Sequence, residues 1–320
     1  MSIRLKLIAL SLFTILVVII SPWLDFSAAG SAEIQQMIIY ELRIPRVLFA
    51  FTAGCGLALC GMVFQAMFRN PLATPFTLGI ASGASLGAAI SVYTGISFTI
   101  LGLSATSLSA FAGALIAISF VYSISRFRFG FSGETLLLTG VAISFFFSSL
   151  ILFIQYLSNV ADSFQIIRWL MGSLTVVGYQ ELKQLLPFVM LTAVVIIYLS
   201  RELNLLMAGD EIATSRGVSV KYVRYALFFV TSLCVGAIVA LCGPIGFVGM
   251  MVPHICRLII GEDHRYLIPA TLLFGGSFLV ICDTLARLVI APAELPVGVI
   301  TTLLGGPFFL WLLMRYKSQH

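Results

Sequence analysis

Asp283 is the acidic residue placed well within an apolar segment of this sequence, and Arg287 follows it four positions later. Residues four apart share one face of a helix, so this spacing predicts an intrahelical ion pair. Ionisable residues inside membrane segments serve proton- and ion-coupled carriers as relay groups. A single carboxylate that already has a cationic partner supports a relay weakly, so an ion-coupled secondary carrier stays the less favoured class.

The histidines and cysteines form no pattern that would bind a metal or catalyse a reaction. His254, His264 and His320 are scattered, and the six cysteines lie in apolar runs without CxxC spacing. Cysteines in such runs are typical of packed cores. No serine–histidine–aspartate or paired-carboxylate constellation assembles either. We therefore predict no catalytic residue, no metal site and no cofactor in this chain, and we expect that it is not an enzyme.

A nucleotide-binding loop is also missing from the sequence. The P-loop motif GxxxxGK[ST] needs a Gly-Lys dipeptide, which occurs nowhere in the chain. If this protein works with ATP, the nucleotide must be hydrolysed in a separate partner chain.

The composition places most of these residues in a membrane. Of the 320 residues, 60% are hydrophobic and 10% are charged, whereas a soluble protein carries roughly a quarter charged residues. We predict an all-α, polytopic membrane protein that forms one transmembrane domain over residues 1–320. With about 20 residues for each span, roughly ten spans are expected. They cover about residues 5–24, 47–67, 75–94, 103–124, 135–157, 184–200, 225–243, 247–260, 267–287 and 296–314.

The distribution of basic residues predicts the orientation. Cytoplasmic loops carry an excess of lysine and arginine, and an even number of spans puts both termini on one side. With both termini cytoplasmic, most of the 18 basic residues are cytoplasmic as well. Those that remain on the outer side are Arg43, Arg46, Arg168, Lys183 and Arg287.

The longest polar stretch, residues 201–224, lies between two apolar segments. Its charged residues are Arg201, Glu202, Asp210, Glu211, Arg216, Lys221 and Arg224. Such a segment cannot lie in hydrocarbon, and its length leaves room for two short helices broken at Gly217. The orientation places it in the cytoplasm, either as a solvated loop or as a docking surface for a soluble subunit.

Proline and glycine predict three interruptions of the helices, at residues 70–75, 243–246 and 305–307. Proline disfavours helix at the residue before it. Broken backbone at membrane depth is tolerated where protein or a water-filled cavity satisfies its polar groups. These breaks therefore either mark a transport pathway or are plain loop connections.

Ordered motifs run through nearly the whole chain. They include Arg43-Ile-Pro-Arg46, Gly61-Met-Val-Phe-Gln65, Arg69-Asn-Pro-Leu-Ala-Thr-Pro75, Trp169-Leu-Met-Gly-Ser173, Gly243-Pro-Ile-Gly-Phe-Val-Gly249, Asp283-Thr-Leu-Ala-Arg287 and Glu294-Leu-Pro-Val-Gly298. Together they resemble the FecCD family, the membrane permease subunits of ABC importers for iron–siderophores, haem and vitamin B12. Any one motif is weak, but the ordered set is specific.

The resemblance implies roles for two groups of residues. In such importers a substrate-binding protein docks through acidic residues onto arginines at the outer mouth, and Arg43, Arg46 and Arg287 match those positions. For Arg43 and Arg46 the alternative is interfacial snorkelling. Residues 201–224 match the family's cytoplasmic coupling helices, which sit in a cleft of the ATPase subunit. The patterned positions there are Gly209, Asp210, Glu211, Ala213, Arg216 and Gly217, and Arg216 stands where the family often has a leucine.

The resemblance also implies a function and a set of partners. It implies a multi-pass permease subunit that carries a ferric siderophore across the bacterial inner membrane by alternating access, with haem or cobalamin as the alternative. The expected partners are a second permease subunit, identical or a sister chain, and two ATP-binding subunits that hold ATP and magnesium. A periplasmic or lipid-anchored binding protein and the lipid bilayer complete the set, and no nucleic acid is expected. The fifth expected span and its neighbours would form part of the pathway wall.

Overall fold

The computed structural model describes residues 2–24, 32–126 and 133–317. Residue 1 and residues 318–320, which include both chain ends, lie outside the described residues. The longer helices are α1 (Ile3–Ile20), α3 (Ile44–Phe68), α4 (Ile80–Thr94), α5 (Ala105–Ile124), α6 (Gly133–Leu157), α8 (Gln180–Tyr198), α11 (Val220–Cys242), α12 (Val248–Ile260), α13 (His264–Leu288) and α14 (Val297–Lys317). The shorter helices are η1 (Ser21–Trp23), α2 (Ala32–Ile38), η2 (Ile39–Arg43), η3 (Pro75–Leu78), α7 (Val160–Leu170), α9 (Ser200–Ala208) and α10 (Asp210–Ser215). A two-residue antiparallel pair, β1 (Thr99–Ile100) with β2 (Leu103–Ser104), precedes α5.

Among the described residues, seven helical segments are long and apolar enough to cross a membrane. They are Ile3–Trp23, Glu33–Phe68, Ala105–Ile124, Thr135–Leu157, Gln180–Tyr198, Val220–Cys242 and His264–Leu288. Three further apolar helices, Ile80–Thr94, Val248–Ile260 and Val297–Leu312, are shorter than that. Each expected span thus falls on an apolar helix, and the mainly helical membrane class is confirmed. Roughly ten complete spans, and termini on the cytoplasmic side, stay predictions.

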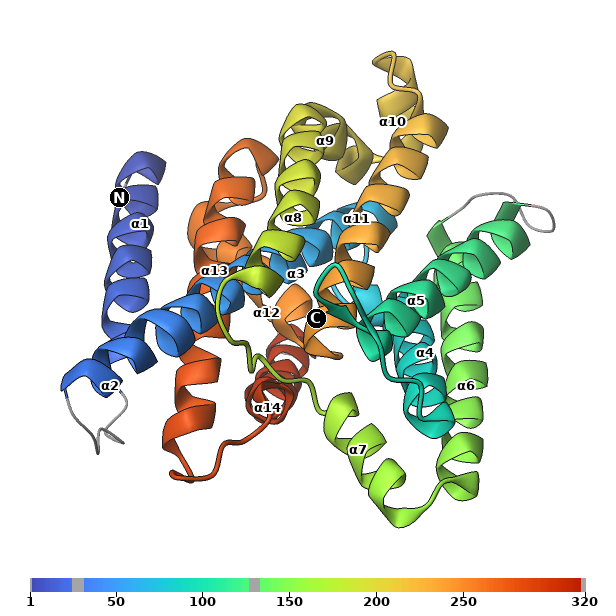
Figure 1. The fold of residues 1–320 in the computed structure, drawn as a ribbon. Coiled ribbons are helices and arrows are strands. Elements are labelled where there is room, and N and C mark those ends of the chain that lie inside the picture. The colour runs from blue at the N-terminus through green and yellow to red at the C-terminus, as the bar shows by residue number, and fades with distance from the viewer. Residues whose placement is uncertain (1, 25–31, 127–132, 318–320) are drawn as a thin grey trace.

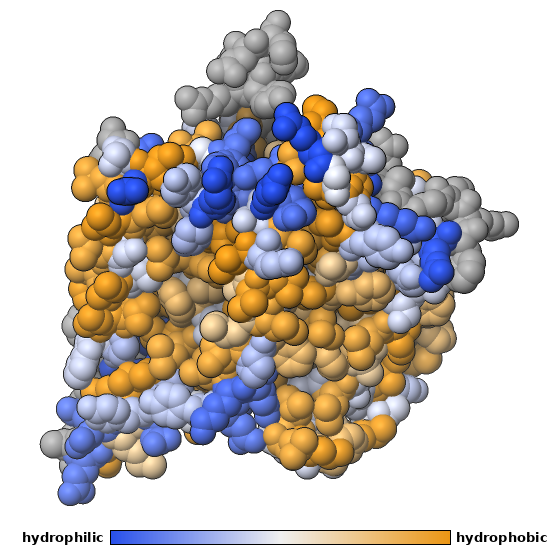
Figure 2. Space-filling view, turned by 90° about the horizontal axis from the view of Figure 1, so that it is seen from above, coloured by the Kyte–Doolittle hydropathy of each residue, from blue (hydrophilic) through white to orange (hydrophobic). Residues whose placement is uncertain are grey.

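The outer surface of the molecule is largely apolar. Leu12 of α1, Phe145 of α6 and Met314 of α14 are 62%, 72% and 68% exposed. Figure 2 shows a broad apolar band between two margins where polar side chains gather. A band of this extent does not face water in a stable monomer, so we infer that it contacts lipid or another membrane subunit.

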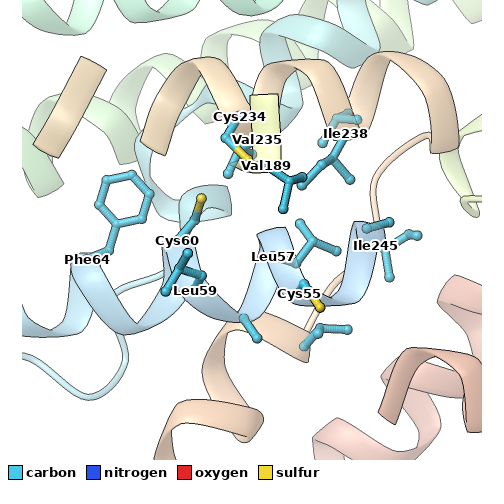
Figure 3. Close-up of a cluster of buried hydrophobic side chains, with 14 of the residues drawn as sticks. Cys55, Leu57, Leu59, Cys60, Phe64, Val189, Cys234, Val235, Ile238 and Ile245 are labelled. Carbon is cyan, nitrogen blue, oxygen red and sulfur yellow. The ribbon is translucent and has the colours of Figure 1, made fainter. Parts of the chain in front are cut away.

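Helix α3 forms the centre of the fold (Figure 1) and packs against α8, α11, α12 and α13. Figure 3 shows its Leu57 and Cys60 beside Val189 of α8 and Cys234 of α11. All six cysteines are buried and free, as their apolar context predicted. A Cβ added at Gly61 would come within 1.8 Å of the carbonyl oxygen of Gly249 on α12. Close backbone approach of this kind is how helices associate in lipid.

Two of the three predicted interruptions are observed, and the third is wrong. Residues 70–75 lie between α3 and α4, with Pro75 as the first residue of η3, and residues 243–246 separate α11 from α12. Helix α14 instead continues through Gly305, Gly306 and Pro307. A Cβ on Gly305 would lie 2.1 Å from the ring of Phe247, so this glycine serves helix packing. Proline is tolerated in membrane helices where the surroundings satisfy the freed carbonyl.

The polar stretch forms two short helices, α9 and α10, but their break differs from the prediction. They separate at Gly209, whose φ of 126° and ψ of 154° belong to a region that is essentially restricted to glycine. Gly217, with φ 82°, lies between α10 and α11. The break between the two short helices is therefore at Gly209, and the prediction that placed it at Gly217 is wrong.

Candidate functional site

Arg46, at the beginning of α3, binds Asp283 of α13 in a bidentate ion pair. Its Nε lies 3.1 and 3.0 Å from the two carboxylate oxygens, and its Nη2 lies 2.9 Å from Oδ1. The two side chains are 12% and 2% exposed. Removing two charges from water is unfavourable unless the pairing geometry is good, and the fork of an arginine matches a carboxylate in this way.

Two further side chains complete this cluster of Arg46, Asp283, Arg287 and Glu294, which we call the outer ion cluster after the side of the membrane on which the sequence predicts it. Arg287 Nε lies 3.4 Å from Asp283 Oδ2, which confirms the predicted intrahelical pair. Glu294 Oε2 lies 2.8 Å from Arg46 Nη1 and is 43% exposed on its side chain. The cluster thus joins α3, α13 and the segment before α14.

The structure brings two of the three predicted docking arginines together. Arg46 and Arg287 both contact Asp283, whereas Arg43 lies on the π-helical turn η2 and donates to the carbonyl of Pro22, 3.3 Å away. Most of the polar atoms of Arg46 are engaged within the protein. Contact of all three with a binding protein stays a prediction. Asp283 and Glu294 each begin one of the quoted motifs, but the resemblance assigned no docking role to either residue.

At the other end of α3, Asp210 is held by two arginines. Its Oδ1 lies 3.0 Å from Nη2 of Arg69, the residue that follows α3, and 2.8 Å from Nη2 of Arg224 on α11. Arg224 is 9% exposed on its side chain, whereas Arg69 and Asp210 are 46% and 40% exposed. We call these three residues the inner clamp, after the cytoplasmic side on which the sequence predicts them. With 1.5 Å of rise per residue, Arg46 and Arg69 are roughly 35 Å apart along α3.

The six predicted coupling residues divide into two groups. Gly209 and Gly217 flank α10, Ala213 is the buried residue of the helix, and Asp210 belongs to the inner clamp. Glu211 and Arg216 are exposed, as is the intervening apolar Ile212 at 48%. Thus α10 presents an outward face of mixed chemistry, while Asp210 attaches it to the helix bundle. Figure 1 shows α9 and α10 at the same edge of the molecule.

A second polar contact attaches α9 to the bundle. Asn204 donates to Asp263 Oδ1 at 2.9 Å, and its own oxygen accepts from the backbone N–H of His264 at 3.0 Å. The pKa of Asp263 lies below its ordinary value: partial burial raises it, but hydrogen bonds from Asn204 and from Arg265 outweigh that effect. Both members of the α9–α10 pair are therefore fixed to the membrane helices through side chains.

Gln65 is a buried polar residue of α3 that the sequence analysis quoted only within a motif. Its Nε2 donates to the carbonyls of Gly249 and Met250 at 3.3 and 3.2 Å, and Arg257 donates to its Oε1. Pro253 lies four residues after Gly249 inside α12 and has no N–H to donate to the Gly249 carbonyl, so Gln65 satisfies a carbonyl that this proline leaves unpaired.

Within the described ranges, no group of three or more histidine, cysteine, aspartate or glutamate side chains is arranged to hold a metal ion. The two sites are therefore sets of ion pairs, one at each end of α3. They can hold helices together, exchange partners with an approaching charged protein, or transmit a displacement between the ends of α3.

Comparison with known proteins identifies the family of this chain. The model of the FecCD transport family matches residues 3–315. The hemin transport system permease protein HmuU of Yersinia pestis is 40% identical over 87% of this chain and 84% of its own length. The iron(3+)-hydroxamate import system permease protein FhuG of Bacillus subtilis is 31% identical over 91% of this chain and 87% of its own. Other relatives carry the names of cobalamin and molybdate import permeases.

The fold matches a solved structure as well. An inward-facing ABC transporter, provisionally of the metal-chelate type, superposes with a TM-score of 0.87 at 31% identity and covers 97% of this chain and 98% of its own. This chain belongs to the FecCD transport family.

Proposed function

We propose that this protein is the permease subunit of an ABC importer that carries a ferric siderophore across the bacterial inner membrane. The observation that carries this proposal is the α9–α10 segment. It is a polar segment with exposed Glu211 and Arg216, attached through Asp210 to the ends of two membrane helices. A solvated loop needs no such attachment, whereas a docking platform does, because it must pass a displacement on.

In this proposal two permease subunits form the pathway at their interface and two ATP-binding subunits dock on α9 and α10. The ATPases hold ATP and magnesium and close on each other, and the motion shifts the opening of the pathway from one side to the other. The exposed apolar faces of α6 and α14 supply surface for the second subunit. A periplasmic or lipid-anchored binding protein delivers the substrate at the end that carries Arg43 and the outer ion cluster.

The proposed substrate is a metal chelate because several similar proteins are named for substrates of that chemical class. Relatives named for a ferric hydroxamate and for haem, together with a provisionally metal-chelate transporter of the same fold, support a metal chelate. Haem or cobalamin is the second candidate, favoured by the 40% identity of the haem and cobalamin permeases. A ferric siderophore remains the substrate that we test first.

An ion-coupled carrier fits the structure less well. A relay carboxylate must exchange its proton or ion with water or with a neighbouring group. Asp283 is 1% exposed and lies between Arg46 and Arg287. Its position is that of a structural counter-charge.

The test is uptake by cells that lack this gene, with and without the gene restored. The panel contains several ferric siderophores, haem, cobalamin and molybdate, each labelled. Restored uptake of one ferric siderophore supports the proposal in full. Restored uptake of haem or cobalamin alone would replace the substrate, and restored uptake of none of the panel would contradict the metal-chelate assignment.

A further inference from the structure

The inner clamp lies where three separate parts of the chain meet. Asp210 begins α10, Arg69 follows α3 and Arg224 belongs to α11. We propose that Asp210 and Arg69 are positioning residues: they fasten α10 to α3, so that a displacement of α10 moves α3, and Asp210 does not itself contact the ATPase. This inference rests on the proposed function, and it reassigns Asp210 from a partner contact to an internal anchor.

The backbone around α10 shows why an anchor is needed. The helix has six residues and lies between Gly209 and Gly217, both of which have positive φ. Glycine at such positions leaves the chain free to pivot. Ala213 is the buried residue of α10, and its methyl group offers little apolar area to hold the helix in place. The two ion pairs of Asp210 therefore decide whether α10 moves with the bundle or independently of it.

The conformation of Arg69 is a second, independent observation. Arg69 has φ 48° and ψ 35°, the left-handed region that a glycine usually occupies after a helix. A side chain in this region adds strain of about 1 kcal/mol. The position nevertheless carries an arginine whose guanidinium reaches Asp210. Strain retained at a charged contact is typical of functional positions.

Helix α3 can carry a displacement from the inner clamp to the outer ion cluster. Most of its residues are buried among α8, α11, α12 and α13, so the helix moves as one body. Arg69 lies at its inner end, and Arg46, in the outer ion cluster, lies at the other. A displacement of α10 that is passed to Arg69 therefore reaches Asp283 and Glu294 through a single helix.

The experiment uses the permease reconstituted in proteoliposomes with its ATPase and binding protein. Three quantities are measured: the ATPase retained by the permease, the rate of ATP hydrolysis, and the substrate moved per ATP hydrolysed. The variants are Asp210→Asn and Arg69→Gly, and the matched control is Arg4→Gln, an exposed arginine of α1. Arg69→Gly removes the guanidinium but suits the left-handed backbone, so the thermal midpoint should be unchanged or higher.

We expect both clamp variants to retain the ATPase and to hydrolyse ATP, while the substrate moved per ATP falls roughly two- to thirty-fold. The Arg4→Gln control should behave like the unaltered protein. Loss of the ATPase from Asp210→Asn, in proportion to lost transport, would overturn the proposal in favour of direct contact. Unchanged transport per ATP in both clamp variants would overturn it as well.

A separate measurement distinguishes failure of the clamp from failure of the proposed function. If the unaltered protein moves no substrate with ATP, the proposed function fails and the role of the clamp in transport fails with it. The clamp as an anchor is still tested by amide hydrogen exchange of the permease alone. Faster exchange across residues 209–217 in Asp210→Asn, compared with Arg4→Gln, supports the anchor, and equal exchange contradicts it.

Discussion

Arg46 and Asp283 lie 237 positions apart in the chain and form a bidentate ion pair between the beginning of α3 and the last part of α13. Asp283 is almost fully buried and also contacts Arg287. The remaining nitrogen of Arg46, Nη1, lies 2.8 Å from Oε2 of Glu294, which is more exposed. The carboxylate of Asp283 thus neutralises two arginines that the family resemblance assigns to docking. Asp283 is therefore the shared counter-charge of Arg46 and Arg287.

We expect Asp283→Asn to destabilise the protein by about 3–5 kcal/mol, because it removes a buried carboxylate that forms ion pairs with both Arg46 and Arg287. Thermal unfolding in detergent measures the effect. Glu294→Gln is the matched control, since it removes a partly exposed carboxylate from the same arginine and should change stability by less than about 1 kcal/mol. Equal, small effects of the two changes would show that Asp283 is not the counter-charge.

The close contact between Gly61 and Gly249 predicts that Gly61→Ala destabilises the fold. The added methyl group would overlap the carbonyl of Gly249, and overpacking of this kind costs about 1–3 kcal/mol. Gly246→Ala is the control, because no atom lies within 4 Å of its added Cβ and its φ is not positive. A Gly61→Ala protein as stable as the control would show that α3 and α12 are less tightly packed than described.

Reversal of charge at Arg43 should weaken the binding protein without unfolding the permease. Arg43 donates to the backbone carbonyl of Pro22 and is not a member of the outer ion cluster. We expect Arg43→Glu to reduce the affinity for the binding protein roughly tenfold or more, in a permease that still folds and inserts in the membrane.

Lys183→Glu is the control for this docking prediction, because Lys183 is exposed and belongs to the same expected outer side. Surface plasmon resonance with the permease in nanodiscs measures both affinities. If Lys183→Glu weakens binding as much as Arg43→Glu, the effect is general electrostatics and the docking role of Arg43 is wrong.

The outward face of α10 should contact the ATPase. Glu211 and Arg216 are exposed, so we expect Glu211→Lys and Arg216→Glu to weaken retention of the ATPase roughly tenfold while the permease stays folded. Co-purification at two salt concentrations measures this, because screening should weaken the unaltered contact as well. Full retention of the ATPase by both variants would place the contact elsewhere on the molecule.

Local features of these sites were accessible from the sequence. The spacing of Asp283 and Arg287 predicted their ion pair, because residues four apart on a helix must be neighbours. The membrane helices were also accessible, because an apolar segment of about 20 residues is long enough to span a bilayer as a helix. The ion pairs of Arg46 with Asp283 and of Arg69 with Asp210 were not predicted. Each pair joins distant segments of the chain, whose contact depends on how whole helices pack.

The incorrect predictions have a common physical cause. A glycine can break a helix or allow close packing, and the choice depends on its neighbours in space. Gly305 faces the ring of Phe247 and lies within a continuous helix. Gly209 takes a conformation that few other residues adopt and ends a helix. The residue type is the same in both places, so only the tertiary structure distinguishes them.

The central claim is that an ATPase partner drives transport through this chain. The most direct test is uptake of a labelled ferric siderophore by cells that contain this permease and its ATPase partner, either active or with the catalytic carboxylate of the ATPase replaced. We predict uptake with the active ATPase and loss of uptake with the inactive one, at equal amounts of permease in the membrane. Uptake that persists with the inactive ATPase would contradict the account and favour an ion-coupled carrier.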